Sequence, residues 1–359
     1  MGNKIAIVLG SNIHWAPYYY RYERLLQDEK CPFDLIYWNR EGIKEESAAN
    51  LISFNVPDVS NNKDPLKVFK FIRFSRFVQR TIEREKYDKL IFLGTHGCAV
   101  SFCATYLAKH YRDKIWIDIR DDEYEWFPPF YWGEKKSIDA SYATAISSYR
   151  YTKFLPPHDY LYIHNIDPNA SQMQQQYVQV PENNVIRISF IGNVRYYEQN
   201  TKLIEQLGND KRFRLQFFGK GSDRIQKYCE ENGIHNTSFF GFFPQNETLR
   251  FYEQTDIINN NYGNETLNLQ TALSNKLYYA LFLRLPLLVS ENTFMEELTK
   301  QFDLSFSFTE SADFADALAC WYNQIQAGII IPRYSELWEK VQAEDAACME
   351  KLREFICSR

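Results

Sequence analysis

The sequence lacks the features that mark several large classes of protein. In its 359 residues, no window approaches the roughly 18 uninterrupted apolar residues that a transmembrane helix requires. Basic residues are not in excess, because 41 Lys and Arg stand against 46 Asp and Glu, for a formal net charge of −5. Binding to nucleic acid phosphates needs a dominant basic field. We therefore expect neither a membrane span nor a nucleic acid partner.

Cysteines are too few and too scattered for a disulfide framework or a zinc site. They are odd in number, and Cys98 and Cys103 lack the nearby Cys and His residues that zinc requires. The N-terminal stretch MGNKIAIVLGSN has too short an apolar run for a secretory signal, and Ala6 stands where a myristoylation motif has Ser or Thr. We expect buried thiols in a cytoplasmic protein, and no metal ion.

Strand-like apolar runs and helical patterns alternate along most of the chain. Such alternation is typical of a mostly parallel sheet covered on both faces. We expect strands at 4–9, 33–38, 89–94, 114–119, 142–147 and 160–164, and again at 186–192, 214–219, 237–242, 255–261 and 285–290. Helices are expected at 66–86, 98–110, 197–207, 222–232, 246–253, 275–283, 293–300, 311–326 and 333–356.

A polar stretch, NASQMQQQYVQVPENN (169–184), interrupts this alternation, and we interpret it as an interdomain linker. The expected domains are 1–168 and 169–332, followed by a crossover helix at 333–359. The predicted fold class is α/β: two doubly wound, Rossmann-like domains facing a cleft, with the C-terminal helix returning to the first domain. Ligands of such sheets bind at the carboxyl ends of the strands.

Glycines follow the first strand of each half, as Gly10 and Gly192. Neither matches GxGxxG, so the fingerprint of a nicotinamide-binding fold is absent. A second turn, Gly219-Lys220-Gly221, follows the next strand of the second half. Glycines there let backbone N–H groups approach an anion, with Arg195 and Lys220 as charge partners. The alternative is that these glycines serve only tight turns.

The stretch SNKLYYALFLRLPLLVS (274–290) places Asn275 and Lys276 at a helix N-terminus. Backbone N–H groups and the helix dipole attract an anion at that position, and Lys276 would add a full positive charge. The alternative is that Ser274 caps the helix and Lys276 is solvated.

Four motifs in order, FIGNVR, FFGKG, FFGFFPQNETLRFYEQTDI and SNKLYYALFLRLPLLVS, resemble the donor domain of GT-B glycosyltransferases, particularly the retaining family 4. In the first half, 145–148 and 163–167 resemble that family's passage into its second domain. The resemblance covers about residues 115–310. It implies a nucleotide-sugar donor, metal-independent hexosyl transfer with retention of configuration, and no further cofactor. The donor-binding residues that it implies are Gly192, Asn193, Arg195, Gly219, Lys220, Gly221, Asn275, Lys276 and Tyr279.

Three cations, Arg195, Lys220 and Lys276, would then neutralise the sugar diphosphate. Because negative charge builds on the leaving phosphate, that role is catalytic for Arg195 and Lys276. The sequence departs from the family at the paired glutamates, which would fall near Thr271 and Tyr279, and at Arg284, where the family has a turn glycine. A left-handed Arg would cost about 1–2 kcal/mol, so we expect this loop to take another shape.

The acceptor side is expected in the first half. Asp118 and Asp121 stand in the polar tail of the strand at 114–119, where a carboxylate could orient an acceptor hydroxyl or take its proton. A solvated acidic loop remains an alternative, and so does a metal-binding DxD, although its spacing does not match. His96 is a third catalytic candidate, because both it and His14 follow strands at the cleft edge.

Two aromatic clusters, 14–22 and 123–132, could stack on sugar rings, and we interpret 126–132 as a proline-broken, acceptor-binding loop. The stretch LKVFKFIRFSRFVQRT (66–81) holds five basic residues on one helical stripe beside a wide apolar face. Such a stripe can sit on an anionic membrane surface. The alternative is a domain helix whose apolar face packs on the sheet.

The sequence therefore predicts a glycosyltransferase that moves a sugar from a nucleotide-diphosphate sugar to a glycan or lipid-linked oligosaccharide. Its expected setting is capsule, O-antigen or exopolysaccharide synthesis, in the cytoplasm or peripherally on the inner face of the plasma membrane. Two alternatives stay open: a catalytically silent nucleotide- or glycan-binding partner, and a nucleotide-sugar 2-epimerase.

Overall fold

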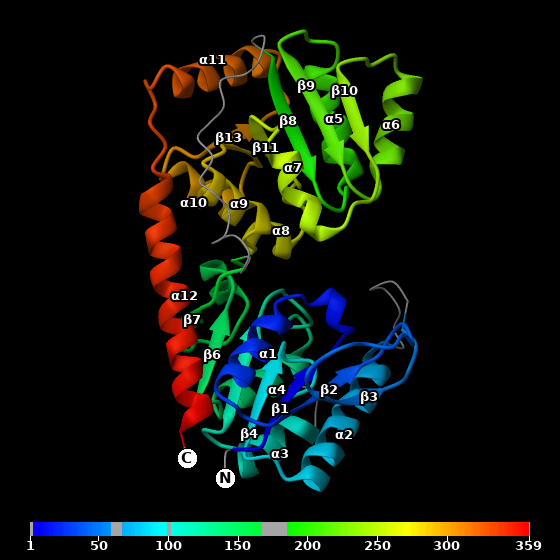
Figure 1. Ribbon diagram of the computed structural model, residues 1–359, viewed down its shortest axis with the longest axis vertical. Helices are drawn as coiled ribbons and strands as arrows, with labels where there is room; N and C mark the ends of the chain where they lie inside the picture. The colour runs from blue at the N-terminus through cyan, green and yellow to red at the C-terminus, as the bar shows by residue number, and fades with distance from the viewer. Residues whose placement is uncertain (1–2, 59–66, 99–101, 167–184, 359) are drawn as a thin grey trace. The chain divides into compact units, whose positions relative to one another are not determined.

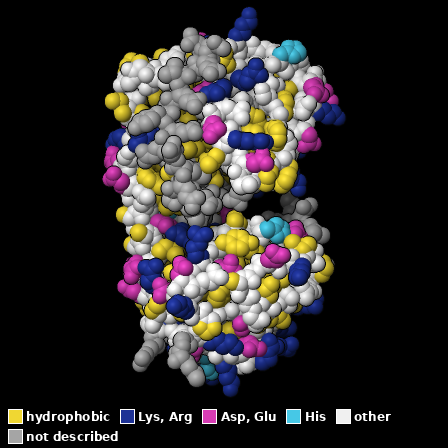
Figure 2. Space-filling view, in the orientation of Figure 1, with side chains coloured by type: hydrophobic (Ala, Val, Ile, Leu, Met, Phe, Trp, Pro, Cys, Tyr) yellow, Lys and Arg dark blue, Asp and Glu magenta, His cyan; other side chains and the backbone are white. Residues whose placement is uncertain are grey.

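Each of two units of the chain is built around one parallel sheet in the computed structural model, which describes residues 3–58, 67–98, 102–166 and 185–358 (Figure 1). Unit 1 comprises residues 1–165 and 342–359, and unit 2 comprises residues 166–341. The expected linker at 169–184 lies outside the described residues. No helix in the described ranges is long and apolar enough to cross a bilayer. On the face shown in Figure 2, side chains of both charge signs are interspersed over each unit.

The unit 1 sheet has seven strands in the order β3-β2-β1-β4-β5-β6-β7. Strands β1, β4 and β5 are buried along their whole length, which explains why they read as continuous apolar runs. Edge strand β3 is half-exposed, so its apolar pattern is weak and the sequence does not predict a strand there. The strands are β1 (Ile5–Leu9), β2 (Phe33–Trp38), β3 (Asn50–Phe54), β4 (Lys89–Leu93), β5 (Ile115–Ile119), β6 (Ala143–Ile146) and β7 (Leu161–Tyr162).

The helices of unit 1 correct one expectation. The helices are α1 (Tyr19–Asp28), α2 (Lys67–Glu85), α3 (Phe102–His110) and α4 (Pro128–Ile138), with short 3-10 turns at Ile13–Trp15 and Tyr149–Lys153. The interpretation of 126–132 as a proline-broken loop is wrong from residue 128 onwards, because Pro128 and Pro129 start α4. The first helical positions have no intrahelical use for a backbone N–H, so proline is tolerated there.

Helix α2 packs as a domain helix on its apolar side. Phe71, Phe74 and Val78 are buried, so the wide apolar face is not available to a membrane. Lys70 forms an ion pair with Asp58 at 2.8 Å. The exposed side chains of α2 include Phe69, with 65% of its surface accessible, and the basic Arg73, Arg76 and Arg80, but also the acidic Glu83. The side chain of Lys67 lies outside the described parts.

Unit 2 holds six parallel strands in the order β10-β9-β8-β11-β12-β13. They are β8 (Ile186–Ile191), β9 (Phe213–Phe218), β10 (Thr237–Phe240), β11 (Ile257–Asn260), β12 (Leu287–Ser290) and β13 (Ser305–Phe308). The helices are α5 (Tyr197–Leu207), α6 (Ser222–Glu231), α7 (Thr248–Tyr252), α8 (Leu267–Thr271), α9 (Asn275–Leu283), α10 (Phe294–Lys300) and α11 (Phe314–Gln326), with a 3-10 turn at Gln245–Glu247. The predicted fold class, two doubly wound α/β units, is confirmed.

The last helix, α12 (Tyr334–Cys357), begins in unit 2 and ends in unit 1. Its final turns join the core of unit 1 through Leu352, Phe355 and Ile356. Asn3 Nδ2 donates to the Ile356 carbonyl at 2.9 Å, and the buried Lys89 ammonium donates to the Phe355 carbonyl, so the helix ends beside the N-terminal segment (Figure 1). The expected return of the C-terminal helix to the first domain is confirmed.

The turn after α9 contradicts the expectation for Arg284. This residue does adopt the left-handed conformation, with φ 57° and ψ 41°. The Leu285 N–H donates to the Ala280 carbonyl at 3.0 Å and closes the helix end in the manner that usually uses glycine. The turn therefore takes the left-handed form that usually needs glycine, with the strain of a side chain there.

Candidate active site

The glycine turns of unit 2 lie at the carboxyl ends of β8 and β9 and contact each other. Gly192 and Gly219 have φ values of 110° and 133°, and a Cβ on Gly219 would fall 1.7 Å from the Gly192 carbonyl oxygen. A Cβ on Gly221 would fall 2.6 Å from the Val194 carbonyl oxygen. Tight packing therefore accounts for Gly219 and Gly221, whether or not an anion binds. Asn193 and Lys220 are exposed beside these turns.

Lys276 is buried at the start of α9, so the alternative of a solvated first-turn lysine is wrong. Ser274 does cap the helix, since its Oγ accepts from the Lys276 N–H at 3.3 Å. Lys276 is 4% exposed, and its ammonium donates to the Asn259 carbonyl at 2.7 Å and lies 3.4 Å from the ring centre of Phe190. Among the described residues, no carboxylate pairs with it. Burial, and then the nearby Arg195, hold its pKa well below the usual value.

Arg195 is the exposed partner of this arrangement. Its guanidinium lies 5.3 Å from the ring centre of Tyr196, which has a left-handed backbone and stacks on Tyr262 at 4.4 Å. The Arg195 carbonyl accepts from Asn200 Nδ2 at 2.7 Å, which ties the loop to α5. Two cations therefore lie near each other at the strand ends. Motif reading did not find Tyr196 and Tyr262, because neither belongs to the glycine or lysine pattern.

The positions of the absent family glutamates are filled by other contacts. Thr271 is fully buried, and its hydroxyl donates to the Leu267 carbonyl at 2.7 Å. Tyr279 is half-buried, with its ring stacked on Tyr252 at 4.7 Å. Asn275 is exposed at the start of α9. Tyr279 and Asn275 thus sit on the helix that carries Lys276.

Asp118 corrects the expectation for the acceptor side. It lies within β5, is fully buried, and accepts hydrogen bonds from Tyr22 at 2.6 Å and from Arg120 Nε and Nη2 at 2.7 and 2.8 Å. Both carboxylate oxygens are engaged, so Asp118 holds Arg120 and has no exposed oxygen to offer a substrate. Asp121 is exposed in the following loop. Within the described ranges, no group of three or more His, Cys, Asp and Glu residues is arranged to hold a metal ion.

His96 follows β4 and pairs with a residue that sequence reasoning missed. Its Nδ1 lies 2.6 Å from Glu123 Oε1. The imidazole stacks on Phe71 with ring centres 4.6 Å apart. Gly94 has a φ of 85°, and a Cβ there would lie 3.0 Å from Glu123 Oε1, so glycine allows this close approach. His14 faces different carboxylates, Glu41 at 3.1 Å and Glu45 at 3.6 Å.

Two further carboxyl groups lie behind Glu123. Glu134 on α4 is fully buried and bonded to Thr95 Oγ1 at 2.9 Å. Burial, together with Glu125 and Glu123, raises the pKa of Glu134 to about 9. Burial and Glu123 raise the pKa of Glu125 to about 7. At neutral pH this cluster therefore holds at least one proton.

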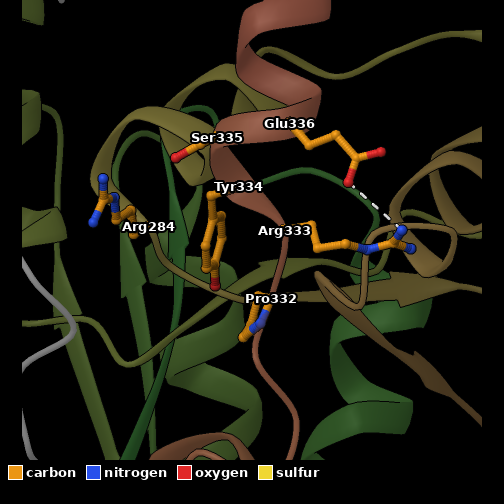
Figure 3. Close-up of a pocket in the computed structure, with 6 residues that line it drawn as sticks. All are labelled: Arg284, Pro332, Arg333, Tyr334, Ser335 and Glu336. Atoms are coloured by element: carbon orange, nitrogen blue, oxygen red, sulfur yellow. Dashed lines mark ion pairs between the residues drawn. The ribbon is translucent and has the colours of Figure 1, made fainter.

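A cavity of about 290 Å³ lies at the start of α12 and contains none of the predicted site residues (Figure 3). It is lined by Arg284, Pro332, Arg333, Tyr334, Ser335 and Glu336. Arg333 faces Glu336 at 3.6 Å across it. Because Arg284 precedes β12, the cavity is at the amino end of that strand, the opposite end from the glycine turns.

Comparison with known proteins establishes the fold class first. The sequence matches no protein-family model and no curated protein. Solved structures match over nearly the whole chain, and they define a GT-B fold. At 10–13% identity, this likeness shows the fold alone.

Three of these solved structures illustrate the likeness. Sucrose-phosphate synthase from Thermosynechococcus elongatus has a TM-score of 0.67 and 10% identity over 99% of this chain and 100% of its own. The lipopolysaccharide outer core galactosyltransferase WaaB has a TM-score of 0.65 and 13% identity over 98% of this chain and 99% of its own. HepE from Anabaena, solved with UDP, has a TM-score of 0.64 and 12% identity over 97% of this chain and 99% of its own.

Proposed function

We propose that this protein is a glycosyltransferase that binds a nucleotide-diphosphate sugar at the strand ends of unit 2. One observation carries the proposal: Lys276 is a buried ammonium without a carboxylate partner among the described residues, and Arg195, a second cation, lies nearby. A buried charge without a counter-charge is costly, and a like charge nearby adds to the cost. A bound diphosphate would supply the missing counter-charge.

The surroundings of Lys276 are suited to an anion such as a phosphate. Lys276 lies in the first turn of α9, so the partial positive charge of the helix N-terminus adds to that of the ammonium, although the Ser274 cap already takes up the Lys276 N–H. Gly192 and Gly219 keep the neighbouring turns free of side chains, although packing alone also requires glycine at 219. Negative charge that builds on the leaving phosphate during transfer would be stabilised by these groups without reorganisation.

The finer parts of the proposal rest on resemblance and on surface chemistry. We propose metal-independent hexosyl transfer with retention, as the family 4 resemblance implies, and a glycan or lipid-linked saccharide as acceptor. The exposed rings of Trp126 and Trp132, with 79% and 53% of their surfaces accessible, support a sugar-binding role for unit 1. Capsule, O-antigen or exopolysaccharide assembly is the proposed setting, on the cytoplasmic side and in peripheral contact with the membrane.

Calorimetric titration with UDP, GDP and dTDP tests the proposal. Lys276→Ala should weaken the preferred nucleotide by about 1.5–3 kcal/mol, the range for a hydrogen bond to a charged group. Arg195→Ala should also weaken it, and because Arg195 is exposed this variant should keep the fold. Lys227→Ala is the matched control, since that side chain is 76% exposed on α6. If none of the three nucleotides binds the unaltered protein, the proposal is wrong.

Proton uptake provides a second test of the same site. Burial holds the pKa of Lys276 well below its usual value, and a bound diphosphate would raise it again. Nucleotide binding should therefore take up protons, which is measured as a binding enthalpy that changes with the ionisation heat of the buffer. In Lys276→Ala this uptake should disappear.

The 2-epimerase alternative has one supporting observation. A putative UDP-N-acetylglucosamine 2-epimerase from Listeria monocytogenes shares the fold, with a TM-score of 0.56 and 12% identity over 90% of this chain and 89% of its own. Incubation with UDP-N-acetylglucosamine without any acceptor separates the two: an epimerised sugar supports the epimerase, whereas slow donor hydrolysis supports transfer. Tight nucleotide binding with neither product would favour the silent binding partner.

A further inference from the structure

A line of hydrogen-bonding groups runs from His96 to the buried Glu134. His96 Nδ1 lies 2.6 Å from Glu123 Oε1. Thr95 Oγ1 lies 3.2 Å from the other oxygen of Glu123 and 2.9 Å from Glu134 Oε1. The four residues come from the turn after β4, the loop after β5, and α4. Thr95 is fully buried, so water does not reach the middle of the line.

Counting protons along this line limits the protonation states that the groups can adopt together. The Thr95 hydroxyl has one proton to donate, yet it contacts two carboxyl groups. If both were ionised, one of them would face only a lone pair of Thr95 in a buried setting. A protonated Glu134 resolves the conflict, because it donates to Thr95 and lets Thr95 donate to Glu123. Glu123 is then the ionised member and accepts the Nδ1 proton of His96.

The burial of the groups agrees with this assignment. Glu134 has a second oxygen that is buried without a hydrogen-bond partner among the described residues, as does Glu125. The two acids contact each other, and that contact is one of the causes that raise the pKa of Glu134 to about 9. Cys98 and Tyr160 are the other titratable groups that feel the charge of Glu134, and Arg40 faces Glu123.

We propose that Glu123, supported by Thr95 and a neutral Glu134, fixes His96 in its Nδ1–H tautomer, so that His96 Nε2 accepts a hydrogen bond from a sugar hydroxyl. In this arrangement Glu123 is a positioning residue. The His96 side chain is 22% exposed, so its outer edge can be reached from solvent. Stacking on Phe71 holds the ring plane. Within the described part of the chain, His96 Nε2 makes no hydrogen bond. The substrate assignment rests on the proposed function, whereas the tautomer does not.

Nitrogen-15 NMR of the imidazoles in the full-length protein tests the tautomer directly. The unaltered protein at a pH where His96 is neutral should show a protonated Nδ1 and an unprotonated Nε2, with His96→Gln identifying the signals. Glu123→Gln should reverse this pattern. Its amide oxygen would accept from Thr95, which leaves the amide N–H groups to donate to His96 Nδ1 and moves the ring proton to Nε2.

Glu134→Gln is the matched control. A glutamine is permanently neutral and can still donate to Thr95, so the His96 signals should keep their positions. Thr95→Ser should behave in the same way, whereas Thr95→Val should not, because it removes the hydroxyl that relays the constraint. The proposal is overturned if Glu134→Gln shifts the tautomer as far as Glu123→Gln does, or if the unaltered protein carries the proton on Nε2.

Kinetics then test the substrate contact. Glu123→Gln should lower kcat/KM for donor hydrolysis or transfer at least tenfold while nucleotide Kd stays unchanged, because the nucleotide is proposed to bind unit 2. A reversed tautomer with unchanged kcat/KM would refute the sugar contact. The NMR readout needs no acceptor, so failure of the proposed glycosyl transfer leaves it intact. Failure of this inference would equally leave nucleotide binding intact.

Discussion

Replacing Glu134 by Gln should stabilise the protein at neutral pH. Burial, Glu125 and Glu123 raise the pKa of Glu134 from the ordinary 4.5 to about 9. Between these values the unfolded chain is ionised while the folded chain keeps its proton, so the folded state binds more protons and stability falls as the pH rises. Each pH unit in this range corresponds to a loss of about 1.4 kcal/mol in the free energy of unfolding, so about 3 kcal/mol is lost between pH 4.5 and pH 7. Glutamine never ionises and avoids that loss.

Because the pKa of the neighbouring Glu125 is also raised, to about 7, the two groups titrate together, and we expect the gain from Glu134→Gln to be about 1–3 kcal/mol at pH 7 and close to zero at pH 4.5. Urea unfolding at pH 4.5, 6 and 7.5 measures the gain, and Glu339→Gln, an exposed position on α12, is the control. A gain that grows with pH only at position 134 is the expected result. A loss of stability at pH 7 would refute the reasoning, because it would mean that Glu134 is ionised and usefully paired in the folded protein.

Three further outcomes are expected. Donor turnover should survive EDTA, because Arg195 and Lys276 would meet the phosphate charge; loss of activity on chelation that magnesium or manganese restores would contradict this. Arg284→Gly should raise stability by about 1 kcal/mol by relieving the left-handed backbone, whereas Arg284→Ala should not. Flotation at low salt should show that the protein binds anionic but not neutral vesicles, and binding should weaken when Arg73 and Arg76 are changed to Glu. If the protein binds neither type of vesicle, α2 has no membrane-docking surface.

The fold was predictable because a parallel sheet is buried on both faces. Runs such as IAIVL in β1 and IWIDI in β5 read as strands without knowledge of their neighbours. What was missed includes both β3, an edge strand that is half-exposed, and β13, a four-residue edge strand in which Ser and Phe alternate. The start of α4 was also missed, because its proline pair resembles a break. Arg284 was misjudged for a different reason, because a closed helix end can outweigh about 1 kcal/mol of backbone strain.

The candidate site shows the same contrast between local sequence patterns and contacts among residues that are far apart in the chain. A capped helix start and a glycine turn are local patterns, so Lys276 and Gly192 could be named from the sequence. The partners of His96 could not, because Thr95 meets Glu123 and Glu134 from 28 and 39 positions away. Asp118 was misread for the same reason, since one of its partners, Tyr22, is 96 positions distant.

The buried side chains of Asp118, Glu134 and Lys276 differ in how the protein balances or avoids their charge. Asp118 is balanced within the chain by Arg120, so nothing further is needed and a structural role suffices. Glu134 is balanced by keeping its proton, which costs stability at neutral pH. Lys276 has no carboxylate partner within the described residues, and Arg195, whose charge also lowers its pKa, has the same sign. Of the three, only Lys276 has a charged form that a bound anion would stabilise, and this is why we propose the donor site at the start of α9.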